Sequence, residues 1–181
     1  MMKRLRTLLQ VGVVGLLSLV LVGTLYAQER GNDKPRVSPN ASVGQTFGTT
    51  KITITYGRPS VKGRQIFGGL QEFGKVWRTG ANESTNITFS NDVKIEGKPL
   101  KAGTYSLYTI PGKDEWTIII NSKLSWGTQY DAGKDVLRVT VKPKEGQPME
   151  QLLISFEEVT DTSAKMIIHW EKTIVPVTIQ S

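Results

Sequence analysis

Short segments in which apolar and polar residues alternate fill most of the chain after residue 42. Residues 51–56 show the pattern most clearly, because Ile52, Ile54 and Tyr56 share one face. Period-two alternation of β-branched and aromatic residues is typical of a strand with one buried face. Eight more segments follow the same rule: 86–89, 93–96, 104–110, 115–121, 137–142, 152–156, 166–170 and 174–179. The pattern predicts a single all-β domain, a β-sandwich or a jelly-roll-like barrel of about nine strands.

The N-terminus follows a different pattern. Lys3, Arg4 and Arg6 precede an almost wholly apolar run, and Ala27 ends the run just before a polar segment. This layout is typical of a secretory signal helix, so we expect residues 1–27 to be removed. The alternative is an uncleaved membrane anchor, for which the apolar run is long enough. We therefore predict an exported protein, periplasmic or extracellular, that contacts a membrane only through this segment if it is not cleaved.

Composition and charge narrow the picture further. The signal segment holds three of the 23 basic residues and no acidic one, so 20 basic and 16 acidic residues remain and the net charge falls from +7 to +4. That value and the scattered basic residues argue against a nucleic-acid partner. Residues 28–42 are polar, include two prolines and show no periodicity, which indicates a flexible linker before a domain over 43–181. The sequence does not indicate an oligomeric state.

The usual catalytic motifs are missing from the sequence. The one histidine, His169, lies in a predicted strand and faces away from the apolar side, so a solvent-facing role is favoured over a catalytic base. One histidine and no cysteine argue against a structural zinc site. Phosphate-loop, nucleophile-elbow and dinucleotide motifs are absent as well. We expect no metal and no cofactor, and the balance favours a protein that is not an enzyme.

Residues 56–85 form the longest interval without a strand pattern. Long loops in compact domains are uncommon and often functional. Apolar side chains should pin this loop to the domain: Ile66, Phe67, Leu70, Phe73, Val76 and Trp77. Arginine forks suit carboxylates, phosphates and sugar hydroxyls, and an indole offers an apolar platform. The candidate ligand-binding residues are Arg58, Arg64, Trp77, Arg78, Asn82 and Glu83.

Each candidate group has a structural alternative. The arginines would instead hold an irregular loop together by pairing with Glu72, Glu83 or backbone carbonyls. A secondary candidate cluster, Trp126, Tyr130 and Asp131, has the residue types that stack on a sugar ring and hydrogen-bond it. The alternative for this cluster is an aromatic plug that closes one end of the sandwich.

Several long runs resemble one family. They are YGRPSVKGRQIFGGL, GKVWRTGANESTNITFS, GKPLKAGTYSLYTIPG, EWTIIIN and WGTQYDAGKDVLRV, and the resemblance extends over about residues 42–179. These runs are similar to the secreted bacterial proteins grouped as domain of unknown function 2911. The resemblance implies export and one compact domain. It assigns no activity and no functional residue.

Three hypotheses for function follow. The first is a non-enzymatic periplasmic or cell-surface domain that binds a small or glycan-like ligand at the 56–85 loop. The second is a hydrolase or lyase that uses Glu83 and an aspartate such as Asp131 as acid and base, with the arginines stabilising an anion. The third is a structural envelope module without a small ligand.

Overall fold

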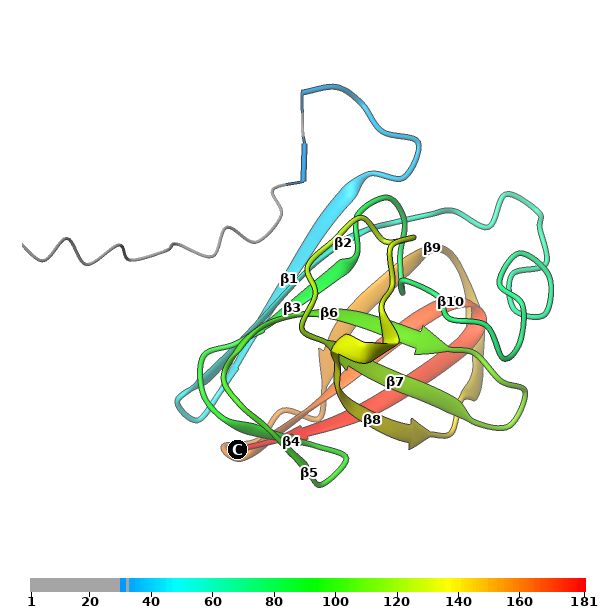
Figure 1. The fold of residues 1–181 in the computed structure, drawn as a ribbon. Helices are drawn as coiled ribbons and strands as arrows, with labels where there is room; N and C mark the ends of the chain where they lie inside the picture. The colour runs from blue at the N-terminus through cyan, green and yellow to red at the C-terminus, as the bar shows by residue number, and fades with distance from the viewer. Residues whose placement is uncertain (1–29, 32) are drawn as a thin grey trace, which may run out of the picture.

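The computed structural model describes residues 30, 31 and 33–181, and the predicted signal helix lies outside this part of the chain. Ten strands of the described chain form two antiparallel sheets (Figure 1). The larger sheet has the order β1 (Asn40–Phe47), β2 (Thr50–Gly57), β3 (Thr85–Phe89), β6 (Gly103–Ile110), β7 (Trp116–Asn121) and β8 (Asp135–Val141). The smaller sheet has the order β5 (Lys98–Leu100), β4 (Val93–Ile95), β10 (Ser163–Gln180) and β9 (Lys144–Glu157).

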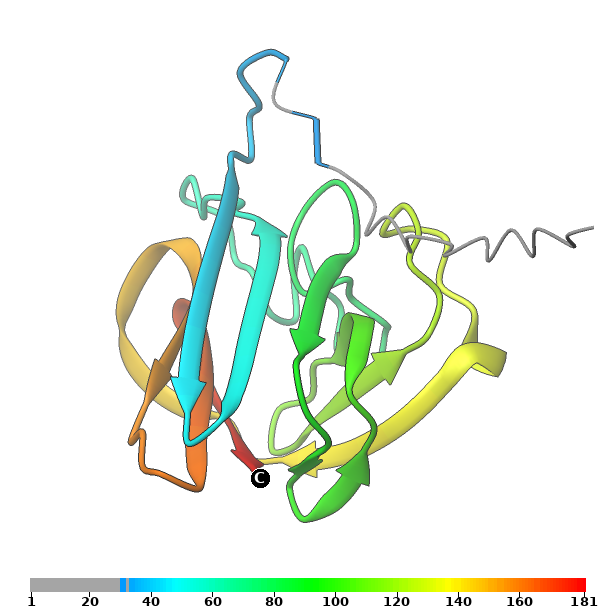
Figure 2. The same ribbon diagram turned by 90° about the vertical axis from the view of Figure 1, so that its left-hand side faces the viewer.

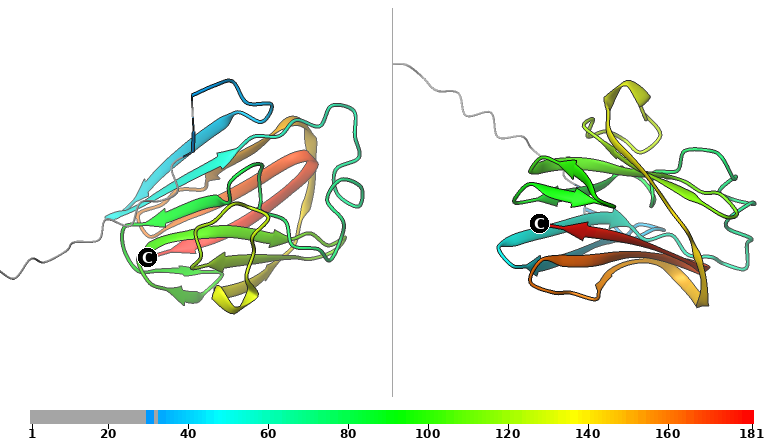
Figure 3. Two further views of the ribbon diagram at one scale, coloured as in Figure 1. Left: turned by 45° about the horizontal axis from the view of Figure 1, so that its top comes forward. Right: turned by 90° about the horizontal axis from the view of Figure 1, so that it is seen from below.

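The core lies between the two sheets, which Figure 3 shows as two layers when the molecule is seen from below. Because side chains alternate along each strand, every second side chain points into the space between the sheets. Ile52 and Ile54 of β2 meet Ile154 of β9 and Ile168 of β10 there, and none of the four is more than 1% exposed. The predicted all-β sandwich is therefore confirmed.

The strand boundaries differ from the predicted ones chiefly in four places. β9 begins at Lys144, eight residues before the predicted segment 152–156. β1 begins at Asn40, so the predicted linker 28–42 overlaps it by three residues, and Arg58 N–H donates to the carbonyl of Pro39 just before the strand. β5 is a three-residue strand paired with β4, too short to show alternation. The last two predicted segments join into the 18-residue β10. Its register against β9 shifts around Glu171, where φ is +54°, and this irregularity breaks the alternation without ending the strand.

Four aromatic rings hold the long loop against the core. The loop covers residues 58–84, and we refer to it as the 58–84 loop. Trp77 stacks on Trp170 of β10 with ring centroids 5.6 Å apart, and Phe67 places its ring edge-on to Trp77, Trp116 and Trp170. Ile66 is fully buried. The loop is thus a folded part of the domain, and Figure 2 shows it from a second side.

Only half of the residues expected to pin the loop do so. Ile66, Phe67 and Trp77 pack on the core, whereas Leu70, Phe73 and Val76 are 47%, 38% and 39% exposed. The prediction was wrong for these three. The aromatic cluster already fills the space beneath the loop, so the remaining apolar side chains lie on its outer side.

Candidate functional site

Arg58 and Arg64 hydrogen-bond to backbone carbonyls. The Nε of Arg58 donates to the carbonyl of Leu152 on β9 at 2.8 Å. Arg64 folds back on its own loop and donates to the carbonyls of Val61 at 2.9 Å and Ser60 at 2.6 Å. Both arginines therefore stabilise the loop through hydrogen bonds to backbone carbonyls, as in the structural alternative. Arg64 also lines the cavity described below.

Glu83 is a buried carboxylate that two arginines bind. Arg36 donates to both of its oxygens at 2.8 and 2.9 Å, and Arg30 approaches Oε2 at 3.4 Å. The side chains of Glu83 and Arg30 are 5% and 7% exposed. Burial alone would raise the pKa of Glu83, but the Arg36 hydrogen bonds and the two positive charges outweigh it and hold the pKa below its ordinary value. Glu83 therefore stays ionised and suits an ion pair better than general-acid catalysis.

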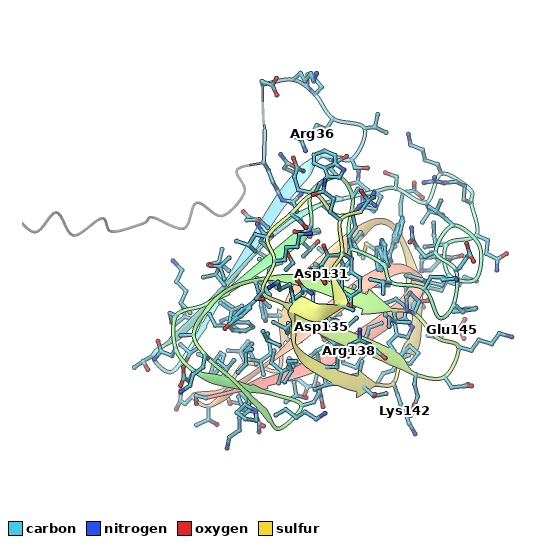
Figure 4. All side chains as sticks on the ribbon, viewed as in Figure 1. Arg36, Asp131, Asp135, Arg138, Lys142 and Glu145 are labelled. Carbon is cyan, nitrogen blue, oxygen red and sulfur yellow. The ribbon has the colours of Figure 1, made fainter. Side chains whose placement is uncertain are left out.

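Arg30 and Arg36 come from the segment that the sequence indicated to be a linker. Arg30 also donates to the carbonyls of Thr55, Glu83 and Ser84. Burial lowers its pKa to about 10, against the opposing charge of Glu83. Figure 4 labels Arg36 on this segment, above the sandwich. The polar composition of residues 28–42 did not indicate the contact of these arginines with Glu83, because Glu83 lies about 50 residues further along the chain.

Arg78 differs from the other arginines of the 58–84 loop. No hydrogen bond or ion pair joins its side chain to any described residue, and its Nε is fully buried without a partner. Burial lowers the pKa of its guanidinium. A half-buried cation without a partner is costly for a folded protein, so its presence is a reason to look for a ligand.

Trp77 and Asn82 have structural roles. Trp77 is 4% exposed and its indole N–H donates to the carbonyl of Gly80 at 3.2 Å, so it is a core residue and offers no platform to a ligand. Asn82 has a φ of +66° and donates through its side chain to the carbonyl of Ser38 at 3.3 Å. Asparagine tolerates this left-handed conformation at a tight turn better than most residues do.

The secondary cluster lies on the segment between β7 and β8, which packs against the 58–84 loop. Asp131 caps the short 3₁₀ helix η1 (Ala132–Lys134) by accepting from the N–H of Gly133. The Tyr130 hydroxyl donates to Asp135 at 2.6 Å and accepts from Arg138 at 2.7 Å. Figure 4 labels Asp131, Asp135 and Arg138 in this region. Trp126 is 44% exposed and Asp131 is also exposed, whereas Tyr130 is partly buried.

The two candidate clusters meet in space. Glu83 and Trp126 form an isolated antiparallel bridge, and the N–H of Gly127 donates to the carbonyl of Asn82 at 3.3 Å. Gly127 lies directly on the stem of Arg78, since a Cβ at this position would fall 2.0 Å from Arg78 Cδ. A glycine is therefore required for the close approach.

A cavity of about 300 Å³ opens between the 58–84 loop and the segment before β1. Three cationic residues contribute to its wall, Lys62, Arg64 and Arg78, and no acidic residue does. The indole nitrogen of Trp170, another wall residue, is buried without a partner. The remaining wall residues are polar, small or apolar: Val37, Ser38, Pro59, Ser60, Leu70, Gln71, Gly80 and Ala81.

Other chemistries find little support in the described part of the chain. No group of three or more His, Cys, Asp or Glu side chains there is arranged to hold a metal ion. No helix among these residues is long and apolar enough to span a membrane. His169 is engaged with the carbonyl of Gln147 at 2.9 Å, in keeping with a structural role on β10.

Comparison with known proteins gives a family for the chain. The model of the family described as "Protein of unknown function (DUF2911)" matches residues 38–179. The chain belongs to the DUF2911 family. No curated protein and no solved structure matches it. The DUF2911 match spans β1 to β10, with both clusters and most of the cavity wall, so the candidate site lies within the family domain.

Proposed function

We propose that this DUF2911 protein is an exported, non-enzymatic domain that binds a small ligand with an acidic group, acidic sugars included, at the 58–84 loop. The observation that carries the proposal is Arg78. It contributes to a cavity wall with two other cations and no acid, and its guanidinium has no partner among the described residues. An anion would supply the missing partner.

The size and lining of the cavity support a ligand of metabolite size. A volume of about 300 Å³ lies at the lower end of the ligand pockets of proteins. Leu70, Pro59 and Trp170 offer apolar contacts, while Ser60 and Gln71 offer hydrogen bonds. This mixture suits a small molecule with one charged end and a body that is partly apolar, which describes an acidic sugar or an organic acid.

The engagement of Glu83 favours a binding domain over a carboxylate-based hydrolase. A hydrolase of that kind needs one carboxyl group that is protonated at working pH. Both oxygens of Glu83 instead accept hydrogen bonds from Arg36, and its pKa is lowered. The other proposed acid–base residue, Asp131, accepts from a backbone N–H at the start of η1.

Arg78→Met separates a binding role from a structural one. Because the Arg78 guanidinium is half-buried and unpartnered, an apolar side chain of similar length should leave the melting temperature unchanged or raise it. The same variant should lose at least about tenfold in affinity for an acidic ligand, since a hydrogen bond to a charged group is worth about 1.5–3 kcal/mol. The measurement is calorimetric titration with uronic acids, peptidoglycan fragments and organic acids, with neutral sugars for comparison.

Arg58→Met is the matched control from the same loop. It removes the hydrogen bond to Leu152, so it should lower the melting temperature while ligand affinity stays within about threefold. The third hypothesis, a structural module, predicts the opposite for Arg78→Met: a lower melting temperature, and no anion in the panel that binds the wild-type domain. That pair of results would refute the proposed function.

A further inference from the structure

Strand pairing places Arg78 beside Tyr108. Trp77 and Thr109 form an antiparallel bridge, so the next pair along is Arg78 and Tyr108. Directly opposed residues in an antiparallel pair have Cβ atoms about 4.5–5.5 Å apart and share one face. Trp77 faces the core, and therefore Arg78 and Tyr108 face away from it, on the outer side of the six-stranded sheet.

The segment between β7 and β8 covers this pair. Gly127 lies on the stem of Arg78, and the ring of Tyr130 stands edge-on to the ring of Tyr108 with centroids 4.9 Å apart. The N–H of Ser84 donates to the carbonyl of Ser125 at 3.2 Å and holds the cover in place. Tyr108 is consequently only 1% exposed, although it lies outside the core between the sheets.

Two polar groups beneath this cover lack a hydrogen bond. Arg78 Nε and the Tyr108 hydroxyl are both buried without a hydrogen-bond partner among the described residues. Burial raises the pKa of Tyr108, and Ser125 and Ser84 lie near enough to its hydroxyl to counter that rise, but neither makes a hydrogen bond of ordinary geometry with it. Ser84 bonds instead with Asn86 and Ser106, and Ser125 donates to the carbonyls of Trp126 and Gln129. Buried polar groups almost always find partners, so two adjacent orphans point to a group that completes them.

The charge balance around Arg78 and Tyr108 favours a carboxylate. One unpartnered cation lies here, and two acidic groups of the surrounding segments are engaged, Glu83 by Arg30 and Arg36, and Asp135 by Tyr130 and Arg138. A carboxylate carries one negative charge and two oxygens, which match one guanidinium and one hydroxyl. A phosphate monoester carries about 1.5–2 negative charges near pH 7 and would leave charge uncompensated at this depth.

We propose that the acidic group of the ligand is a carboxylate bound between Arg78 and Tyr108, with Tyr108 as the residue that sets this specificity. This inference rests on the proposed function and names the ligand class of the same site. Arg78 also belongs to the cavity wall, so a carboxylate bound between Arg78 and Tyr108 would direct the rest of the molecule into the cavity.

Tyr108→Phe tests the inference, and Tyr105→Phe is its control. Tyr105 lies on the same strand and donates its hydroxyl to the carbonyl of Lys101, at the opposite end of β6 from Arg78. Affinity for a uronic acid should fall at least about tenfold in Tyr108→Phe and stay unchanged in Tyr105→Phe. The sugar phosphate with the same ring should bind the wild type more weakly than the uronic acid does.

The outcomes distinguish this inference from the proposed function. If Arg78→Met abolishes binding while Tyr108→Phe binds as the wild type does, Tyr108 has no role and the inference fails, but the proposed function stands. Tighter binding of the sugar phosphate overturns the carboxylate class. If no acid in the panel binds the wild-type domain, both fail. A measurement on the wild type keeps the test valid if Tyr108→Phe unfolds. When uronic acid is added to protein with labelled tyrosines, the ¹³Cζ chemical shift of Tyr108 should change and that of Tyr105 should not.

Discussion

The contact between Glu83 and the two arginines should contribute substantially to stability, and Glu83→Gln measures it. The substitution keeps the shape of the side chain and removes its charge. Arg30, whose side chain is 7% exposed, then loses its counter-charge but keeps the carbonyls of Thr55 and Ser84. Arg36, whose side chain is 21% exposed, is free to turn to water.

The expected loss is about 3 kcal/mol at pH 7. Removing one member of a buried ion pair costs about 3–5 kcal/mol, and the alternative partners of Arg30 place this case at the lower end. For a domain of this size, that loss corresponds to a fall of roughly 10 °C in melting temperature. Asp92→Asn is the matched control, since it breaks the Asp92–Lys101 pair, whose side chains are 58% and 87% exposed, and should change little.

The loss of stability in Glu83→Gln should also depend on pH. The pKa of Glu83 is lowered in the folded state, so its contribution to stability is fully present above its unfolded value near 4.5 and is lost as pH falls through the folded value. Thermal unfolding of wild type and Glu83→Gln from pH 7 to pH 3 should therefore give curves that converge at low pH. A melting temperature within about 2 °C of the wild type at pH 7, or a deficit that does not change with pH, would refute this reasoning.

Two further outcomes are expected. Gly127→Ala would place a methyl group 2.0 Å from Arg78 Cδ and 2.8 Å from the Asn82 carbonyl, so it should lower the free energy of unfolding in urea by about 1–3 kcal/mol and weaken ligand binding. The control is Gly44→Ala, whose methyl group would lie 3.6 Å from its nearest neighbour. Equal stability of the two variants would contradict the packing described for Gly127. When the full-length chain is expressed in a host that exports it, intact-mass measurement should show a mature protein that begins near Gln28. Leu16→Arg should block this cleavage. An uncleaved chain in the membrane fraction would instead support the membrane anchor.

Much of the fold followed from local patterns. Alternation located the central strands, because Ile52, Ile54 and Tyr56 need a buried face whichever strand lies next to them. The same rule could not find β5, with three residues, or the continuity of β10 through its irregularity at Glu171. These features depend on pairing with distant strands, and a local pattern does not record that pairing.

The candidate site was only partly predictable. The length, glycines and arginines of the 58–84 loop indicated where to look, but they could not separate Arg78 from Arg58 and Arg64. That distinction depends on which carbonyls lie within reach after folding. Tyr108 was missed because it reads as an ordinary strand residue, and its relation to Arg78 exists only through the Trp77–Thr109 bridge. Trp77 was named as a candidate ligand-binding residue because an irregular loop has no periodicity that would mark a core residue.

The most direct test of the central claim is to observe the arginine Nε–Hε signals by ¹⁵N nuclear magnetic resonance while a uronic acid is added. In the structure, Arg58 Nε donates to Leu152 and Arg64 Nε to Val61, whereas Arg78 Nε has no partner. We predict that the signal lost in Arg78→Met is the one that shifts most on saturation and becomes more protected from exchange, while the Arg58 signal stays in place. Saturating ligand that leaves the Arg78 signal unmoved would contradict the proposal that this guanidinium binds an acidic ligand.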